Sequence, residues 1–409
     1  MSRSMPGDVN SYYGYHFPTQ LIHRLFTRGS ARPENRAFDA ELDIDGKVIW
    51  RRSISCATAS DLKALMLEKR FKALHLGAIF DMPARLSKNP RCQIVGREVV
   101  FDLDLTDVTW LAIERDDQLQ NDRYVKATFA SAQFLIETLK LMFNYEHFMP
   151  VYSGRRGVHV WVFDERCVEY SSKTRSLFEG VSITKASAHD NKIVSSNGIR
   201  DFKTGTLNPC FPWKLFFQLW DQVIVAPQRS GGVGLLDKPR DVTTFVCKYF
   251  DFNSDVVYRT ARQKMRTSVA TAVSGKIGKT AFDAMKEAVS ENAFYKNRLF
   301  EVQLSLLFPR IDAEVTKSIK HATKCPFSVH AANGRVALPV RDLVSSSTNQ
   351  LPPVVRGDQL GKCEKTDFIF KQSLEYFESV VERVCPPHPK FGGTDIEDLV
   401  CASRKSQKT

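Results

Sequence analysis

The sequence lacks the patterns that mark several specialised classes of protein. Its nine cysteines are scattered singly, without a C-x-x-C pair or the clustered Cys/His spacing that holds structural zinc. No run approaches the roughly 18 apolar residues of a membrane span. The first residues also lack the apolar core of a secretory signal. We therefore expect a soluble intracellular protein with reduced thiols, no structural zinc and no membrane contact.

Positive charge is the main compositional feature that is present. The chain of 409 residues has 58 Lys and Arg against 46 Asp and Glu, a formal net charge of +12. Such an excess favours a polyanionic partner through phosphate contacts and counterion release. Basic proteins without a nucleic acid partner also exist, because net charge governs solubility as well as association. The length predicts two or three folded units.

Strand and helix patterns alternate over the first 165 residues, which indicates an α/β unit with a mixed sheet. Residues 37–55 are typical of a hairpin that turns at Asp45-Gly46. Residues 124–143 repeat apolar side chains at helical spacing, which predicts one long helix.

Individual residues also predict where helices begin and end. A helix is expected over residues 12–25 with an interruption at Pro18, because proline cannot donate the backbone hydrogen bond that continues a helix. Thr58-x-x-Asp61 resembles a capping box. A further amphipathic helix is expected over residues 367–384.

Composition along the chain suggests four segments. Residues 1–168 form the first part of an α/β catalytic module, and residues 169–300 form a mostly helical insertion. Residues 301–345 return to the module, and residues 346–409 contain a linker, a C-terminal helix and a disordered tail.

The most informative segment is EVVFDLDLTD, where alternation places Asp102 and Asp104 on one face of a strand. Side chains so placed can converge on divalent cations, which prefer hard oxygen ligands. The simpler interpretation of a bare D-x-D is a solvated strand face near a turn. Hydrophobic residues on both sides of the pair indicate a central strand whose acidic face borders a cleft, which favours a metal site.

A second segment, YSGRRGVHVWVF, packs two arginines and two glycines into a turn that leads into a strand. Ser153 and the exposed N–H groups of such a turn can donate to phosphate oxygens, and Arg155 and Arg156 can donate paired hydrogen bonds to a triphosphate. His159 lies on the strand next to the turn. A lone histidine on a strand is usually structural, but its place beside two arginines favours phosphate contact.

A third segment carries an acid and two cationic or titratable groups. Asp312 in FPRID would by itself be interpreted as a helix cap, and together with the acidic pair it suggests the third carboxylate of a two-metal site. Lys324 and His330 can add charge to a triphosphate site, although each alone is typical of a surface residue. Strands are expected at residues 326–330 and 335–340, because the N-G pair between them is a strong hairpin signal.

Four sequence blocks resemble those of a known family. VFDLDLTD, SGRRGVHVWV, FPRID and KCPFSVHAANGR resemble, in the same order, the signature blocks of archaeal and eukaryotic DNA primase small subunits. The resemblance covers most of the chain outside residues 170–290 and the tail. It implies the prim fold, an α/β catalytic module that carries a helical subdomain.

The resemblance also implies residue roles and cofactors. The implied metal ligands for two Mg²⁺ or Mn²⁺ ions are Asp102, Asp104 and Asp312. The implied contacts to a ribonucleoside triphosphate are Ser153, Arg155, Arg156, His159, Lys324 and His330.

The chain departs from the family pattern at three places. Residues 108–150 contain no cysteine, although members of the family typically carry a small zinc knuckle there. Ala37 stands where the family has an acidic residue, and His75 stands where an aspartate often precedes the G-A pair. Arg51 is the candidate for a basic contact from the first hairpin.

The expected activity is synthesis of short RNA primers on single-stranded DNA, in a nuclear complex with a primase large subunit and the DNA polymerase alpha assembly. One alternative is a self-sufficient primase-polymerase that uses deoxynucleotides. The other is a catalytically inactive nucleic-acid-binding scaffold of the same fold. Template preference, primer length and the partner interface do not follow from the sequence.

Overall fold

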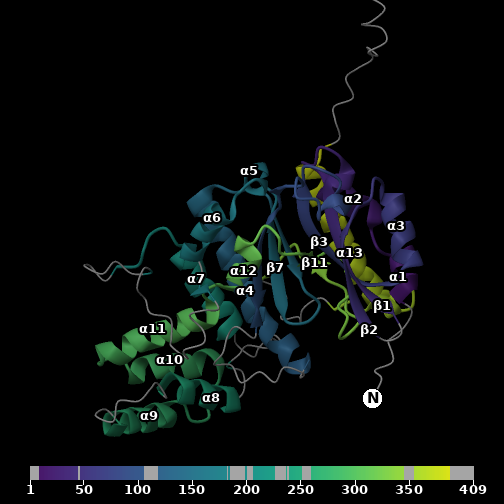
Figure 1. Ribbon diagram of the computed structural model, residues 1–409. Helices are drawn as coiled ribbons and strands as arrows, with labels where there is room; N and C mark the ends of the chain where they lie inside the picture. The colour runs from purple at the N-terminus through teal and green to yellow at the C-terminus, as the bar shows by residue number, and fades with distance from the viewer. Residues whose placement is uncertain are drawn as a thin grey trace, which may run out of the picture.

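The computed structural model describes residues 9–44, 47–105, 118–181, 183–184, 199, 206–225, 236, 239–250, 259–344 and 354–386. The predicted turn at Asp45-Gly46, residues 346–353 of the predicted linker and the C-terminal tail lie outside these residues. Two sheets with their covering helices form one part of the protein, and a group of helices forms another (Figure 1).

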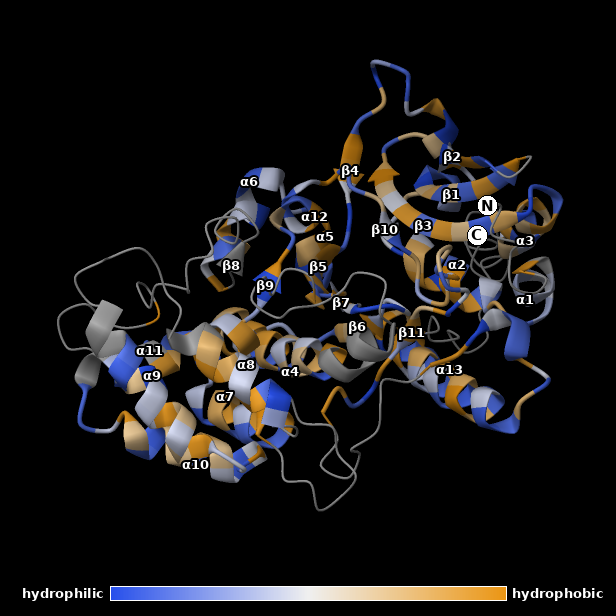
Figure 2. Ribbon diagram, turned by 90° about the horizontal axis from the view of Figure 1, so that it is seen from below, coloured by the Kyte–Doolittle hydropathy of each residue, from blue (hydrophilic) through white to orange (hydrophobic). Residues whose placement is uncertain are grey.

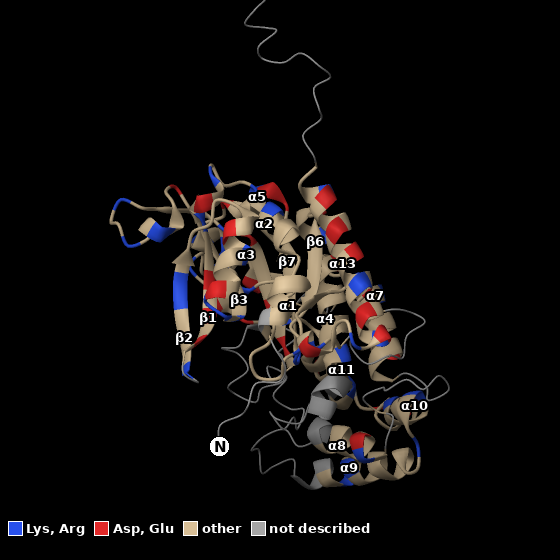
Figure 3. Ribbon diagram, turned by 90° about the vertical axis from the view of Figure 1, so that its right-hand side faces the viewer, with Lys and Arg blue, Asp and Glu red and all other residues tan. Residues whose placement is uncertain are grey.

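The first sheet has the strand order β10-β3-β1-β2, and β4 also pairs with β3. Its five strands are β1 (Arg36–Ile44), β2 (Lys47–Ile54), β3 (Phe71–Phe80), β4 (Ile94–Gly96) and β10 (Thr323–Lys324). Strands β1 and β2 form the predicted hairpin, and β2 is the edge strand. Figure 3 marks basic residues along β2 in blue.

One face of this sheet is covered by helices. They are α1 (Val9–Tyr15), α2 (Thr19–Thr27), α3 (Ala59–Glu68) and α13 (Glu364–Val384). Phe38, Leu74 and Phe377 belong to the apolar core that joins sheet and helices. The predicted break at Pro18 is confirmed, since α1 ends before it and α2 begins directly after it. The predicted capping box is confirmed at the start of α3.

The second sheet has the strand order β11-β6-β7-β5. Its strands are β5 (Val99–Asp104), β6 (Phe148–Tyr152), β7 (Gly157–Val162) and β11 (Leu338–Pro339). Both large sheets are antiparallel throughout, so the predicted mixed sheet is wrong for them. The turn between β6 and β7 is too short for the crossover that a parallel pair requires. A parallel pair is formed separately by β8 (Ile183–Thr184) and β9 (Arg310–Ile311).

Strand β5 lies at the edge of its sheet, so the prediction of a central strand is wrong. The chain that follows β9 covers this edge. The backbone N–H of Asp312 donates to the carbonyl of Asp102 (2.9 Å), and the hydroxyl of Thr316 in α12 (Ala313–Lys317) donates to the carbonyl of Val100 (3.0 Å). β5 has the apolar pattern of a central strand because both faces are covered: Val100 packs in the core shared with the first sheet, and Phe101 and Leu103 pack in the core that includes α4.

The predicted strands at residues 326–330 and 335–340 are mostly replaced by an irregular turn. A single bridge joins Val329 and Val336, and regular pairing is confined to β11. Phe327 has φ of 63°, which interrupts the extended backbone that a strand requires. The turn at Gly334 forms as predicted, with its N–H bonded to the carbonyl of His330 (2.9 Å).

The helical group contains a short π-helix, Trp220–Ile224, and five α-helices. They are α7 (Trp213–Leu219), α8 (Pro239–Phe250), α9 (Arg259–Val273), α10 (Gly278–Ala288) and α11 (Ala293–Leu307). Figure 2 shows apolar and polar residues alternating around α10, as expected for a helix that packs on one side. The segment boundary expected at residue 300 falls within α11.

Helix α4 (Gln118–Phe143) connects the sheets to the helical group. Phe134 packs into the core of the helical group, whereas Phe129 and Leu135 pack against the second sheet. This double packing ties the two parts together. Among the described helices none combines the length and the apolar character needed to cross a lipid bilayer.

Buried charges connect β1, β5 and the segment after β9. Arg36 donates to both carboxylate oxygens of Glu98 (3.1 and 2.8 Å), and the two side chains are 0% and 1% exposed. Arg97 donates to the carbonyls of Val315 and Ser318 (3.0 and 2.7 Å). The segment that carries Asp312 is therefore anchored to β5 from several sides.

Candidate functional site

The two predicted acidic residues lie side by side on β5. The side chains of Asp102 and Asp104 are 27% and 26% exposed. Their sequence neighbours Phe101 and Leu103 are buried on the opposite face of the strand. Val100 lies on the same face of β5 as Asp102 and Asp104, and this face is directed toward the first sheet. The alternation inferred from sequence therefore holds in the structure.

His159 stands opposite Asp102 on the neighbouring strand β7. Its Nε2 is 3.6 Å from a carboxylate oxygen of Asp102. Burial, followed by the positive charge of Lys324, lowers the pKa of His159 to about 3. The imidazole is therefore neutral at physiological pH, with one ring nitrogen that donates and one that accepts.

Arg156 is engaged with the acidic pair. Its Nε lies 3.0 and 3.1 Å from the two carboxylate oxygens of Asp104. This contact brings the predicted phosphate-binding turn directly onto the predicted metal-binding strand. It also means that Asp104 has a cationic partner within the protein.

The turn that carries Arg156 is held by close backbone packing. Gly154 has φ of 84°, and a Cβ at this position would meet the carbonyl of Arg335 at 3.2 Å, so glycine is required here. The hydroxyl of Ser153 accepts from the backbone N–H of Gly157 (3.1 Å), and the side chain of Asn333 donates to the carbonyl of Gly154 (3.1 Å). Ser153 thus closes the turn.

Asp312 is close to the acidic pair, but its side chain has a second role. Its backbone N–H is bonded to Asp102, and its carboxylate accepts from the N–H of Glu314 (3.1 Å) at the start of α12. Asp102 and Asp104 supply the oxygen donors that a divalent cation prefers. Within the part of the chain that the structure describes, no three His, Cys, Asp or Glu side chains form a metal-binding group.

Lys324 approaches the same region from β10 of the first sheet, and His330 approaches it from the irregular turn that follows. Lys324 pairs with His75 across β10 and β3. Burial lowers the pKa of Lys324 to about 8, although Glu41 and Asp102 act in the opposite direction. Burial also lowers the pKa of His330 to about 2, with further contributions from Lys324, Arg155 and Arg156. The predicted basic residues therefore influence one another's charge.

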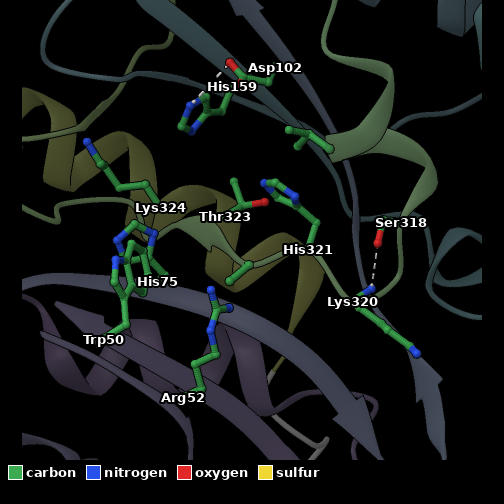
Figure 4. A pocket seen from close by; sticks show the side chains of 12 residues that line it. Trp50, Arg52, His75, Asp102, His159, Ser318, Lys320, His321, Thr323 and Lys324 are labelled. Carbon is green, nitrogen blue, oxygen red and sulfur yellow. Dashed lines mark hydrogen bonds and ion pairs between the residues drawn. The ribbon is translucent and has the colours of Figure 1, made fainter.

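A pocket of about 510 Å³ lies between the two sheets. Figure 4 shows Asp102 and His159 on one side and the side chains of the first sheet on the other. Three of the predicted residues line it: Asp102, His159 and Lys324. The described lining does not include the other predicted site residues, which are Asp104, Ser153, Arg155, Arg156, Asp312 and His330.

Sequence reasoning did not select Trp50 and Arg52, nor the lining residues between 315 and 323, which include Lys320 and His321. It proposed Arg51 as the basic contact of the hairpin, but alternation along β2 places Trp50 and Arg52 together on the pocket side. The available signal was the W-R-R run at the end of an alternating strand. His75, which was selected only as a departure from the family pattern, also lines the pocket.

An acidic pair that faces neutral imidazole, ammonium and guanidinium groups is typical of proteins that bind phosphate-bearing ligands together with divalent cations.

Comparison with known proteins gives the family. The DNA primase small subunit family matches residues 101–342, more than half of the chain. The chain belongs to the DNA primase small subunit family.

Curated relatives match over most of their length. The DNA primase small subunit of Drosophila melanogaster is 25% identical over 342 residues, which cover 80% of this chain and 75% of that protein. The DNA primase small subunit of Saccharomyces cerevisiae is 23% identical over 380 residues, which cover 90% and 88%. The solved polymerase domain of Mycobacterium tuberculosis ligase D in complex with DNA aligns with a TM-score of 0.41 and 11% identity over 93% of this chain and 92% of that chain.

Proposed function

We propose that this chain is the catalytic subunit of a DNA primase, which joins ribonucleoside triphosphates into a short RNA primer on a single-stranded DNA template. The observation that carries the proposal is one pocket that holds the carboxylate of Asp102, the imidazole of His159 and the ammonium group of Lys324. In this reaction a 3′-hydroxyl attacks the α-phosphorus, a new P–O bond forms, and the bond to pyrophosphate breaks.

The residues divide the chemistry between them. Asp102 and Asp104, with Asp312 beside them, are proposed to hold the divalent cations. Bound Mg²⁺ or Mn²⁺ supplies Lewis-acid stabilisation of the charge that develops at the reacting phosphate. Lys324 offsets triphosphate charge, and neutral His159 donates a hydrogen bond without adding a charge.

The turn residues are proposed to bind the far end of the triphosphate. Ser153, Arg155, Arg156 and His330 form this group, which belongs to the prim fold that we propose for the sheets. Arg156 contacts Asp104 in the structure. We propose that Arg156 leaves this carboxylate for a phosphate oxygen when cation and nucleotide bind. Asp104 would then pair with the cation, and Arg156 would pair with the phosphate.

We further propose that the protein works in the nucleus, as a heterodimer with a primase large subunit that joins the DNA polymerase alpha complex. The words "small subunit" in the family description support a partner subunit. Co-purification of the full chain with a co-expressed large subunit tests this assembly.

The catalytic proposal is tested by de novo synthesis on poly(dT) with ATP and Mn²⁺. Wild-type protein should make primer, and the Asp102→Ala/Asp104→Ala variant should fall to background because it lacks the oxygen ligands. Asp283→Asn is the matched control, since Asp283 is a carboxylate in an exposed ion pair on α10 (2.8 Å to Lys286). Undiminished synthesis by the double variant would refute the metal assignment.

The same assay separates the alternatives. Incorporation of dATP on this template at a rate equal to that of ATP would favour a self-sufficient primase-polymerase. DNA binding without incorporation of either nucleotide, with the large subunit present, would favour an inactive scaffold.

A further inference from the structure

The pocket has an aromatic end that the proposed chemistry does not use. Trp50 lines the pocket and is 45% exposed, although it is one of the largest apolar side chains of the protein. It lies on the edge strand β2, where six consecutive residues from Lys47 to Arg52 are exposed. Trp50 therefore contributes little to the core.

The position of this indole is fixed by its neighbours. The Trp50 ring packs against the His75 ring with centroids 4.7 Å apart, and Nε2 of His75 lies 2.9 Å from a carboxylate oxygen of Glu41. The guanidinium carbon of Arg52 lies 5.2 Å from the centre of the indole. Arg52 is in turn 3.3 Å from the carboxylate of Asp39. Carboxylates on β1 thus hold an exposed aromatic and guanidinium surface in place.

The two ends of the pocket suit different parts of one ligand. Asp102 and His159 form the charged end, and Lys324 extends toward them from β10 of the first sheet (Figure 4). Trp50 and Arg52 lie on the same sheet, farther from Asp102. Pockets of about 300–1,000 Å³ accept small ligands of nucleotide size. Phosphates match the charged end, so a nucleotide bound there directs its base toward Trp50.

We propose that Trp50, with Arg52 beside it, is the surface on which the base of the incoming nucleotide stacks. Bases stack on indole rings and on guanidinium planes, and such stacking tolerates all four bases because each has a π-face. His75 is a positioning residue that holds the indole toward the pocket. The inference rests on the proposed function, because it takes the bound ligand to be a nucleoside triphosphate.

The experiment compares two probes that differ in the base. Binding of a non-hydrolysable ATP analogue and of inorganic tripolyphosphate is measured by calorimetry with Mn²⁺ for the full chain and for Trp50→Ala. The variant should bind the ATP analogue about tenfold more weakly, the typical contribution of one stacked base. Its affinity for tripolyphosphate should be unchanged. Trp50→Phe should recover most of the loss because it keeps a stacking ring.

Controls separate the possible failures. Phe368→Ala, which removes an exposed aromatic residue of α13, should change neither affinity. Equal binding of the ATP analogue by wild type and Trp50→Ala would overturn the stacking role, as would an equal loss for both probes. Weaker binding of single-stranded DNA alone would assign Trp50 to the template and also overturn it. Wild-type protein that binds neither probe would instead refute the proposed function.

Discussion

Lys324 illustrates how one buried residue can set the working pH of a site. It lies on β10 opposite His75 and lines the pocket together with Asp102. Burial lowers its pKa to about 8 because the low-dielectric surroundings disfavour the charged ammonium form. The positive charge that we propose for phosphate binding is therefore present below pH 8 and lost above it.

We predict that kcat/KM for ATP falls as the pH rises through about 8, since this parameter reports the ionisation of the free enzyme. Lys324→Arg should move the fall to higher pH, because guanidinium stays charged throughout the accessible range. Steady-state rates from pH 6.5 to 9.5 check this. If kcat/KM decreases over the same pH range in both proteins, Lys324 does not control this decrease.

Glu98 is the residue on which the buried charges of the sheets depend. Burial by itself would raise the pKa of Glu98, but the paired guanidinium of Arg36 outweighs burial, so the pKa lies below its ordinary value. The backbone carbonyl of Glu98 also accepts from buried Arg175 (3.1 Å). Removing the carboxylate charge would leave cations in the core without their counter-charge.

We predict that Glu98→Gln lowers the free energy of unfolding by about 3–5 kcal/mol, as expected when one partner of a buried ion pair is lost. Asp283→Asn, which breaks an exposed pair on α10, should change it by less than about 1 kcal/mol. Urea denaturation followed by circular dichroism measures both. Equal stability of the two variants would contradict a structural role for the buried pair.

At the scale of elements, the segment after β9 covers the open edge of β5 next to the acidic pair. β5 is an edge strand, and the segment from Asp312 to Thr316 occupies the edge that would otherwise be open to solvent. The hydroxyl of Thr316 is one side-chain link of this cover, beside the guanidinium of Arg97, and Asp312 is four residues before Thr316. Loosening the cover should therefore disturb both stability and the placement of the third carboxylate.

We predict that Thr316→Val lowers the free energy of unfolding by about 1–3 kcal/mol, because the buried carbonyl of Val100 loses its donor while side-chain volume is kept. Primer synthesis should fall as well. Thr271→Val is the matched control, since the hydroxyl of the exposed Thr271 donates to the carbonyl of Thr267 within α9. Full activity of a destabilised Thr316→Val protein would show that the cover supports the fold alone.

At the scale of the whole molecule, the excess positive charge should govern template binding. The net charge is +12, and basic residues lie along the exposed edge strand β2 (Figure 3). Helix α4 packs in both the helical core and the sheet core, so both parts of the protein present their charges from one connected body.

We predict that affinity for oligo(dT) falls at least about tenfold between roughly 50 and 200 mM NaCl, because each neutralised phosphate releases counterions. Fluorescence anisotropy with a labelled oligonucleotide measures the slope. An affinity that does not change with salt would refute an electrostatic role for the basic surface.

The sequence by itself determined the features that depend on neighbouring residues. Pro18 separates two helices because its ring removes one backbone donor, and Thr58 starts a helix because its side chain reaches the N–H of Asp61. Alternation along β5 places Asp102 and Asp104 on one face for the same local reason.

Only the tertiary structure decided which distant segments meet. The edge position of β5, the backbone contact of Asp312 with Asp102, the pairing of Arg156 with Asp104 and the exposed Trp50 in the pocket all depend on contacts between segments that are far apart in the chain. Alternation fixes the side of a strand on which a residue lies but does not specify its partner strand. That choice follows from the combined burial of both sheets, which no local pattern encodes.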